Sequence, residues 1–143
     1  LCSLNLRDGF TNICYVELLR TKFFLEKNHD LKTFFTQIEE KIKTAYYTLV
    51  IFGSFAKRKE KKESDLDLII ITTTKDIGEE IERVTQSEAF FLQRKVQTII
   101  LSEQEFRENL ISKETNVVKE AFKNHIIVAG AEGFYNGVKK AIW

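Results

Sequence analysis

The sequence predicts one α+β (α/β) domain in which helices flank a small mixed β-sheet. Short apolar runs rich in Val and Ile alternate with longer segments whose apolar residues recur at helical spacing. The 143 residues are enough for one domain with a substantial core, and 43% hydrophobic with 30% charged residues is typical of a globular protein. No apolar run reaches the ~20 residues of a membrane span. Two cysteines without metal-ligand spacing favour reduced thiols, so we expect a cytoplasmic protein.

Residues 1–42 are predicted to be an N-terminal helical segment, and residues 43–143 to be the principal domain. Alternation of side chains predicts a short strand over residues 3–7. A helix is predicted over residues 10–27, and its core-facing residues are expected to be Ile13, Val16, Leu19, Phe23 and Phe24. Asp30 is expected to cap a second helix. The predicted core-facing residues of that helix are Leu31, Phe34, Phe35, Ile38 and Ile42.

Two apolar runs enclose a charged loop at the centre of the chain. The run 49–52 ends at Gly53-Ser54, and the run 65–71 opens with Asp65 and Asp67. Residues two apart on a strand point to the same face, so we expect both carboxylates to lie together. Adjacent carboxylates repel unless a cation lies between them, and Mg²⁺ prefers such hard oxygen ligands. The alternative is a structural turn capped by Ser64-Asp65, with the charged loop as a solvated hairpin tip.

The remaining sequence predicts three helices, two strands and a C-terminal helix. They are, in order, a helix capped by Asp76 that continues toward residues 90–92, a strand over 96–101, a helix from Ser102 to Ile111, a short helix from Thr115 to Phe122, an edge strand over 125–128 ended by Gly130, and a last helix that buries Phe134, Tyr135, Val138 and Ile142. Ser102 and Glu105 have the spacing of a capping box, which fixes the start of one helix.

The central stretch resembles the nucleotidyltransferase superfamily of the DNA polymerase β type, and most closely its minimal nucleotidyltransferases. The family's Gly-Ser pair with an aromatic, Ala and a basic residue is matched by 53–57, and its Ser-Asp-x-Asp-Leu strand by 64–68. The resemblance implies a nucleotidyltransferase fold and transfer of a nucleoside monophosphate, most plausibly AMP from ATP, to a hydroxyl. It further implies that Asp65 and Asp67 bind Mg²⁺. The residues implied to hold the nucleotide are Gly53, Ser54, Lys57 and Ser64.

Two positions depart from the family pattern. The family's third acidic residue lies one position into the next strand, where this chain has Gln97. An amide oxygen can ligate a metal, but the amide brings no charge and cannot act as a base. Arg58 stands where the family usually has Gly, and a left-handed conformation there costs a non-Gly residue on the order of 1 kcal/mol. The alternative to an enzyme is therefore a catalytically degenerate domain that binds a nucleotide or a partner.

The net charge of the chain and two further family resemblances indicate which partners to expect. A net charge of +1 argues against a wholly basic nucleic-acid binder, although residues 57–63 carry five positive and two negative side chains. Such a run is usually a solvated loop, and beside a triphosphate site it can also attract a polyanion. Minimal relatives include antitoxins that modify a partner toxin. The N-terminal segment resembles the link between a winged-helix DNA-binding domain and a nucleotidyltransferase domain in archaeal proteins, which implies a regulator with a preceding domain. His29 is expected to face solvent, and neither it nor His125 has a partner in the sequence.

Overall fold

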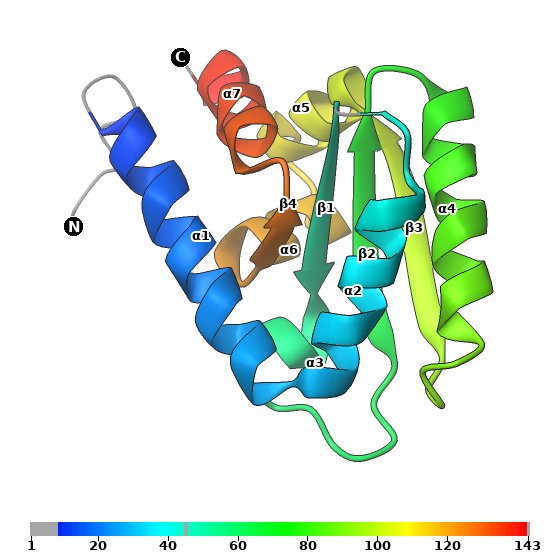
Figure 1. The fold of residues 1–143 in the computed structure, drawn as a ribbon. Helices are drawn as coiled ribbons and strands as arrows, with labels where there is room; N and C mark the ends of the chain where they lie inside the picture. The colour runs from blue at the N-terminus through cyan, green and yellow to red at the C-terminus, as the bar shows by residue number, and fades with distance from the viewer. Residues whose placement is uncertain (1–8, 45, 143) are drawn as a thin grey trace.

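The fold is a four-stranded sheet with helices on both faces, as seen in a computed structural model that describes residues 9–44 and 46–142 (Figure 1). The strand order is β3-β2-β1-β4; β1 is antiparallel to β2 and β4, while β2 and β3 are parallel. The elements are α1 (Phe10–Lys27), α2 (His29–Lys41), β1 (Tyr47–Phe52), α3 (Gly53–Ala56), β2 (Leu66–Thr72), α4 (Lys75–Ala89), β3 (Val96–Ser102), α5 (Glu103–Ile111), α6 (Val117–Lys123), β4 (Ile126–Ala129) and α7 (Ala131–Ile142). The mixed α+β class predicted from the sequence is confirmed.

Alternate residues of β1 and β2 belong to two hydrophobic cores, one on each face of the sheet. Leu66, Leu68 and Ile70 pack with α2 and α4 residues, whereas Ile69 and Ile71 pack with residues of α5, α6 and α7. This alternation is the period-two geometry of a strand that is covered on both sides. Within the described ranges, no helix is long and apolar enough to cross a membrane.

Most predicted elements are present, and several helix starts differ. The predicted helix 10–27, the third strand, the capping box at Ser102 and the edge position of the last strand are confirmed. The predicted caps were wrong at three places: Asn28, Thr74 and Asn116 occupy the N-cap positions instead of Asp30, Asp76 and Thr115. Ile142 is 57% exposed rather than buried. The strand predicted over residues 3–7 lies outside the described residues.

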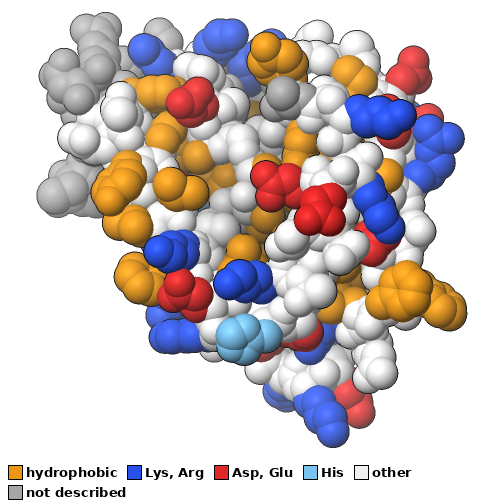
Figure 2. Space-filling view, in the orientation of Figure 1, with side chains coloured by type: hydrophobic (Ala, Val, Ile, Leu, Met, Phe, Trp, Pro, Cys, Tyr) orange, Lys and Arg blue, Asp and Glu red, His pale blue; other side chains and the backbone are white. Residues whose placement is uncertain are grey.

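Helix α1 is oriented differently from the sequence prediction. Phe24 is buried as expected, but Val16 and Phe23 are 51% and 60% exposed, while Glu17 and Thr21 are buried. Figure 2 accordingly shows hydrophobic side chains on the surface over α1, at the left of the view. The predicted core face of this helix was therefore wrong at Val16 and Phe23 but right at Ile13, which packs against the core, and at Phe24; a buried polar anchor also attaches the helix.

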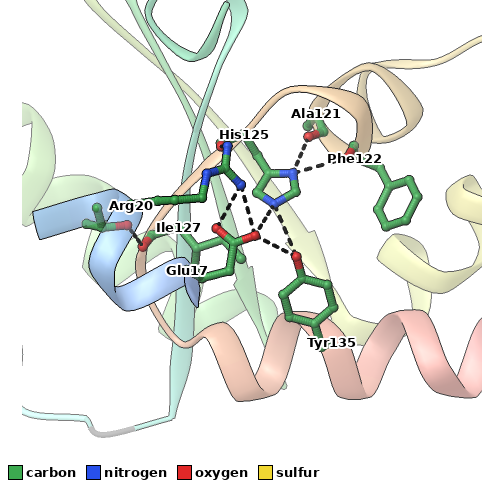
Figure 3. A network of polar contacts seen from close by, with 8 residues as sticks. Glu17, Arg20, Ala121, Phe122, His125, Ile127 and Tyr135 are labelled. Carbon is green, nitrogen blue, oxygen red and sulfur yellow. Dashed lines mark hydrogen bonds and ion pairs between the residues drawn. The ribbon is translucent and has the colours of Figure 1, made fainter. Parts of the chain in front are cut away.

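That anchor is a buried network centred on the Glu17 carboxylate (Figure 3). Arg20 donates to both Glu17 oxygens at 3.0 and 3.1 Å, and Tyr135 from α7 donates to Oε1 at 2.7 Å. His125 Nε2 lies 3.1 Å from the same oxygen, and its Nδ1 donates to the Ala121 carbonyl at 3.0 Å. Burial raises the pKa of Glu17, but the hydrogen bonds from His125 and Tyr135 and the nearby positive charges outweigh it, so the pKa is lowered.

Glu17→Gln is expected to destabilise the fold by about 2 kcal/mol, because buried donors lose a charged acceptor. A carboxyl whose pKa is lowered on folding stabilises above its unfolded pKa, and this stabilisation is lost as the pH falls through the folded value. The difference between wild type and variant should thus shrink below the ordinary glutamate pKa of 4.5. Urea unfolding at several pH values measures it, with the exposed Glu26→Gln as the matched control. Equal stability of both variants at neutral pH would contradict this role.

Candidate functional site

Three strand ends bring the sequence-predicted site residues together at one end of the sheet. Phe52, the last residue of β1, pairs with Asp67, and Asp67 pairs with Gln97 on β3. Asp65 directly precedes β2 and shares the parity of Asp67. The two carboxylates and the Gln97 amide therefore project from the same face of neighbouring strands.

Gly53 has a conformation and a contact that only glycine permits. Its φ is +71°, and a Cβ at this position would lie 2.4 Å from Asp67 Oδ2. A left-handed φ is costly for side-chain-bearing residues, and the contact distance excludes any added carbon. The Gly53 backbone and the Asp67 carboxylate consequently form one compact corner, with Ser54 next in the chain at the start of α3.

The Gln97 side chain contacts the carboxylate pair directly. Its Nε2 donates to Asp65 Oδ2 at 2.6 Å, and its backbone lies opposite Asp67. The amide thus gives one Asp65 oxygen a hydrogen-bond donor but does not neutralise the charge of the carboxylate. The other amide atom, an oxygen, is chemically able to act as a neutral metal ligand.

Asp67 is in an unfavourable environment for a charge. Burial raises the pKa of its carboxyl first, and the charges of Asp65 and Glu120 raise it further. Glu120 belongs to α6 and pairs with the Lys57 ammonium, so Lys57 is held by a protein carboxylate here. Glu120 could not be predicted from the sequence, because 63 residues separate it from Lys57 and no motif links them.

Glu120→Gln is expected to lower the pKa of Asp67, because it removes one of the two negative charges that raise it. Carboxyl chemical shifts followed by NMR during a pH titration measure this directly. Glu114→Gln, an exposed carboxylate that precedes α6, is the control that should leave the Asp67 titration unchanged. An unchanged Asp67 pKa in the Glu120 variant would show that the two groups are not coupled.

Arg58 adopts the left-handed conformation that the family pattern assigns to Gly. Its φ is +54°, its N–H donates to the Phe55 carbonyl at 3.1 Å, and the Lys59 N–H donates to the Ser54 carbonyl at 2.9 Å. This pair of bonds is a Schellman motif that ends α3 after Lys57. The loop therefore tolerates the strain at Arg58 and keeps the glycine-type path.

Arg58→Gly is expected to stabilise the protein by about 1 kcal/mol, because glycine relieves the left-handed strain. The adjacent Lys59→Gly is the matched control: its backbone does not have a positive φ, so it should be neutral or destabilising. Thermal unfolding of both variants measures the difference. A lower melting temperature for Arg58→Gly would show that the arginine side chain contributes more than its backbone costs.

Ser64 and Arg94 fix the loop that leads into β2. The Ser64 hydroxyl accepts from the Lys61 N–H at 2.7 Å, and the Ser64 carbonyl accepts from Arg94 at 3.0 Å. Ser64 therefore closes a local turn, which agrees with the alternative interpretation of this stretch as a capped turn. Asp65 nevertheless lies beside Gln97. The predicted role of Ser64 toward a nucleotide rests on its position alone.

The donor set fits one divalent cation that a substrate helps to coordinate. Two carboxylates and an amide oxygen are hard ligands, and the like-charge repulsion that raises the pKa of Asp67 is what a cation relieves. Among residues 9–44 and 46–142, no group of three or more His, Cys, Asp and Glu side chains is placed to hold a metal. A second cation, held only by protein carboxylates, does not fit this set.

The histidines lie outside this arrangement. His29 is exposed at the start of α2, as predicted. His125 is buried in the α1 anchor, where its partner Glu17 is 108 residues distant in the sequence. Neither residue contacts the carboxylates in the structure as described.

A mixed sheet that presents two strand-end carboxylates beside a Gly-Ser corner defines the nucleotidyltransferase class of domain. The sequence model of the family described as Polymerase beta, Nucleotidyltransferase matches residues 29–127, and the chain belongs to this family. The match contains the whole sheet except the last residues of β4, together with every residue of the corner. A search of curated proteins gives no significant match.

Proposed function

We propose that this domain transfers a nucleoside monophosphate, AMP from ATP in the first instance, to a hydroxyl of a protein or nucleic-acid acceptor in a Mg²⁺-dependent reaction. The observation that carries the proposal is the corner itself, in which the Asp67 carboxylate closely approaches the Gly53 backbone and Asp65 lies on the same strand face, bonded to Gln97. The acceptor hydroxyl would attack the α-phosphorus, the new P–O bond would form, and the bond to pyrophosphate would break. The hydroxyl proton would leave to solvent or a nearby base.

In this proposal each residue of the corner has a distinct part. Asp65 and Asp67 would hold Mg²⁺, which when bound neutralises the phosphate charge and polarises the phosphoryl oxygens. Gly53 leaves room for the phosphates near the strand ends, and the Ser54 hydroxyl would donate to them. Lys57 would exchange its Glu120 partner for the triphosphate, which is the stronger anion.

Gln97 favours a second candidate function, a catalytically degenerate domain that binds a nucleotide or a partner. The Gln97 amide occupies the place of the third carboxylate, so the charge that would complete a second metal site is missing. Such a domain would hold Mg²⁺–ATP without transferring it, and would act as an antitoxin-like protein or a regulator.

Pyrophosphate release separates the two functions. Each of the four nucleoside triphosphates is incubated with Mg²⁺, the protein and an acceptor mixture of RNA and protein, and pyrophosphate is followed by a coupled enzymatic assay. Release that needs both Mg²⁺ and acceptor supports transfer. Tight Mg²⁺-dependent nucleotide binding without release supports the degenerate domain, and absence of both contradicts the proposal.

A further inference from the structure

A cavity lies at the same end of the sheet as the carboxylates. Its volume is about 540 Å³, within the range of pockets that hold small organic ligands. Residues of α2, of the charged loop and of the α4–β3 connection line it; those used below are Lys62, Phe91, Gln93, Arg94, Asp30 and Glu88. None of these residues belongs to the corner formed by Gly53, Ser54, Asp65, Asp67 and Gln97, although Arg94 donates to the Ser64 carbonyl.

Two adjacent aromatic side chains are exposed here: Phe91 lines the cavity, and Phe90 directly precedes it in the chain. Phe90 and Phe91 are 85% and 77% exposed, and their rings meet edge to face with centroids 5.5 Å apart. They follow the last residue of α4, and Figure 2 shows hydrophobic side chains projecting at the right of the molecule, near that end of α4. Gln93, which follows them, has a φ of +54°, so the segment is held in a strained turn.

The charged loop beside this cavity is mainly positive, whereas the cavity lining itself carries two cations, Lys62 and Arg94, and two anions. Lys62 belongs to the loop 57–63, whose seven exposed residues include five cations and two anions. Arg94 is fixed by stacking over the Phe55 ring, with 4.9 Å to the centroid, and by its bond to Ser64. The two acidic residues of the cavity are already engaged, Asp30 with Arg94 at 3.8 Å and Glu88 with Lys41.

We propose that Phe90, Phe91 and the cationic loop form a binding surface for single-stranded nucleic acid, whose bases stack on the phenyl rings while Lys and Arg side chains contact the phosphates. Exposed aromatic rings beside a cationic groove are how proteins bind single strands with little sequence preference. A duplex hides its base faces, so it cannot use the phenyl rings. This inference rests on the proposed function, since it names the acceptor class of the same domain.

The distance from this surface to the carboxylates suits an acceptor strand. Arg94 precedes β3 by two residues and Gln97 is the second residue of β3, so three residues of extended chain separate them by at most roughly 10 Å. Val96 and Leu66 belong to the core on the α2 side, so Asp67 and Gln97 project from the opposite face. A strand bound at the phenyl rings would therefore pass over the end of the sheet to bring a terminal hydroxyl to Asp65 and Asp67.

The test is binding of a fluorescein-labelled RNA of about 12 nucleotides, measured by anisotropy in EDTA so that neither metal nor nucleotide contributes. Phe90→Ala with Phe91→Ala should weaken single-strand binding about tenfold or more, and the melting temperature should not change because both rings are exposed. Phe23→Ala, which removes a phenyl ring on α1 that is 60% exposed, is the control. Lys59, Lys61 and Lys62→Gln together should reduce the slope of log K against log salt by about 2.

Three results would overturn the inference. The first is an unchanged affinity of the Phe90/Phe91 variant for the single-stranded RNA. The second and third are a wild type that binds duplex RNA, or a poly-Glu peptide, as tightly as the single strand. Each result would show that charge alone accounts for the binding. Mg²⁺–ATP binding is measured on the same samples. A wild type that binds Mg²⁺–ATP but not the RNA overturns this inference alone, whereas a wild type that does not bind Mg²⁺–ATP overturns the proposed function.

Discussion

The double substitution Asp65→Asn and Asp67→Asn is expected to abolish Mg²⁺-dependent ATP binding. Asparagine keeps the shape of each side chain but removes the two negative charges that would hold the cation on which binding of the triphosphate depends. Isothermal titration calorimetry with and without EDTA measures this loss. The matched control is Asp76→Asn with Glu79→Gln, which removes two exposed carboxylates from α4.

Unfolding cannot explain that loss. A carboxyl whose pKa is raised on folding destabilises the native state when ionised, so the folded protein gains when Asp67 loses its charge. The double variant should therefore melt no lower than wild type at neutral pH. Unchanged Mg²⁺–ATP affinity in a folded double variant would refute the assignment of the site.

The second large effect is expected at Gln97. Gln97→Asp places a third carboxylate beside Asp65 and opposite Asp67, where the amide now donates at 2.6 Å. A second metal at the attacking oxygen contributes several kcal/mol to the transition state, so the rate of nucleotidyl transfer should rise about a hundredfold or more. Three ionised carboxylates also repel one another, so Mg²⁺ should raise the melting temperature of this variant more than that of wild type.

Gln97→Asn is the matched control, because it shortens the side chain equally without adding charge. Single-turnover kinetics at saturating Mg²⁺–ATP measure the rate of each protein. A wild type that turns over rapidly, together with a Gln97→Asp variant of equal rate, would show that the third carboxylate has no role in this chain.

The arrangement of the corner was predictable because it depends on short-range rules. Strands have a period of two, so Asp65 and Asp67 had to share a face, and the parallel register of β2 with β3 places Gln97 opposite Asp67. The left-handed conformation at Arg58 follows from the same local comparison with the family pattern. Local sequence spacing determines the shared face of Asp65 and Asp67 and the turn at Arg58, whereas the position of Gln97 also depends on the pairing of β2 with β3.

The features that could not be predicted depend on contacts between distant segments. The periodicity of α1 favoured Val16 and Phe23 as core residues, but Glu17 finds Tyr135 and His125 at separations of 118 and 108 residues. These donors satisfy the buried Glu17 carboxylate. In the helix orientation that buries it, Val16 and Phe23 face outward. The pairing of Lys57 with Glu120 is equally non-local.

The chemistry of transfer is tested most directly by the position of the retained label. ATP labelled at either the α- or the γ-phosphate is incubated with Mg²⁺, the Gln97→Asp variant and RNA or protein acceptors, and covalent label is measured after denaturation. Nucleotidyl transfer retains the α-label on the acceptor and releases the γ-label as pyrophosphate. Label retained from the γ-position, or equal α-labelling by a variant that also lacks the Asp65 and Asp67 charges, would contradict the proposed reaction.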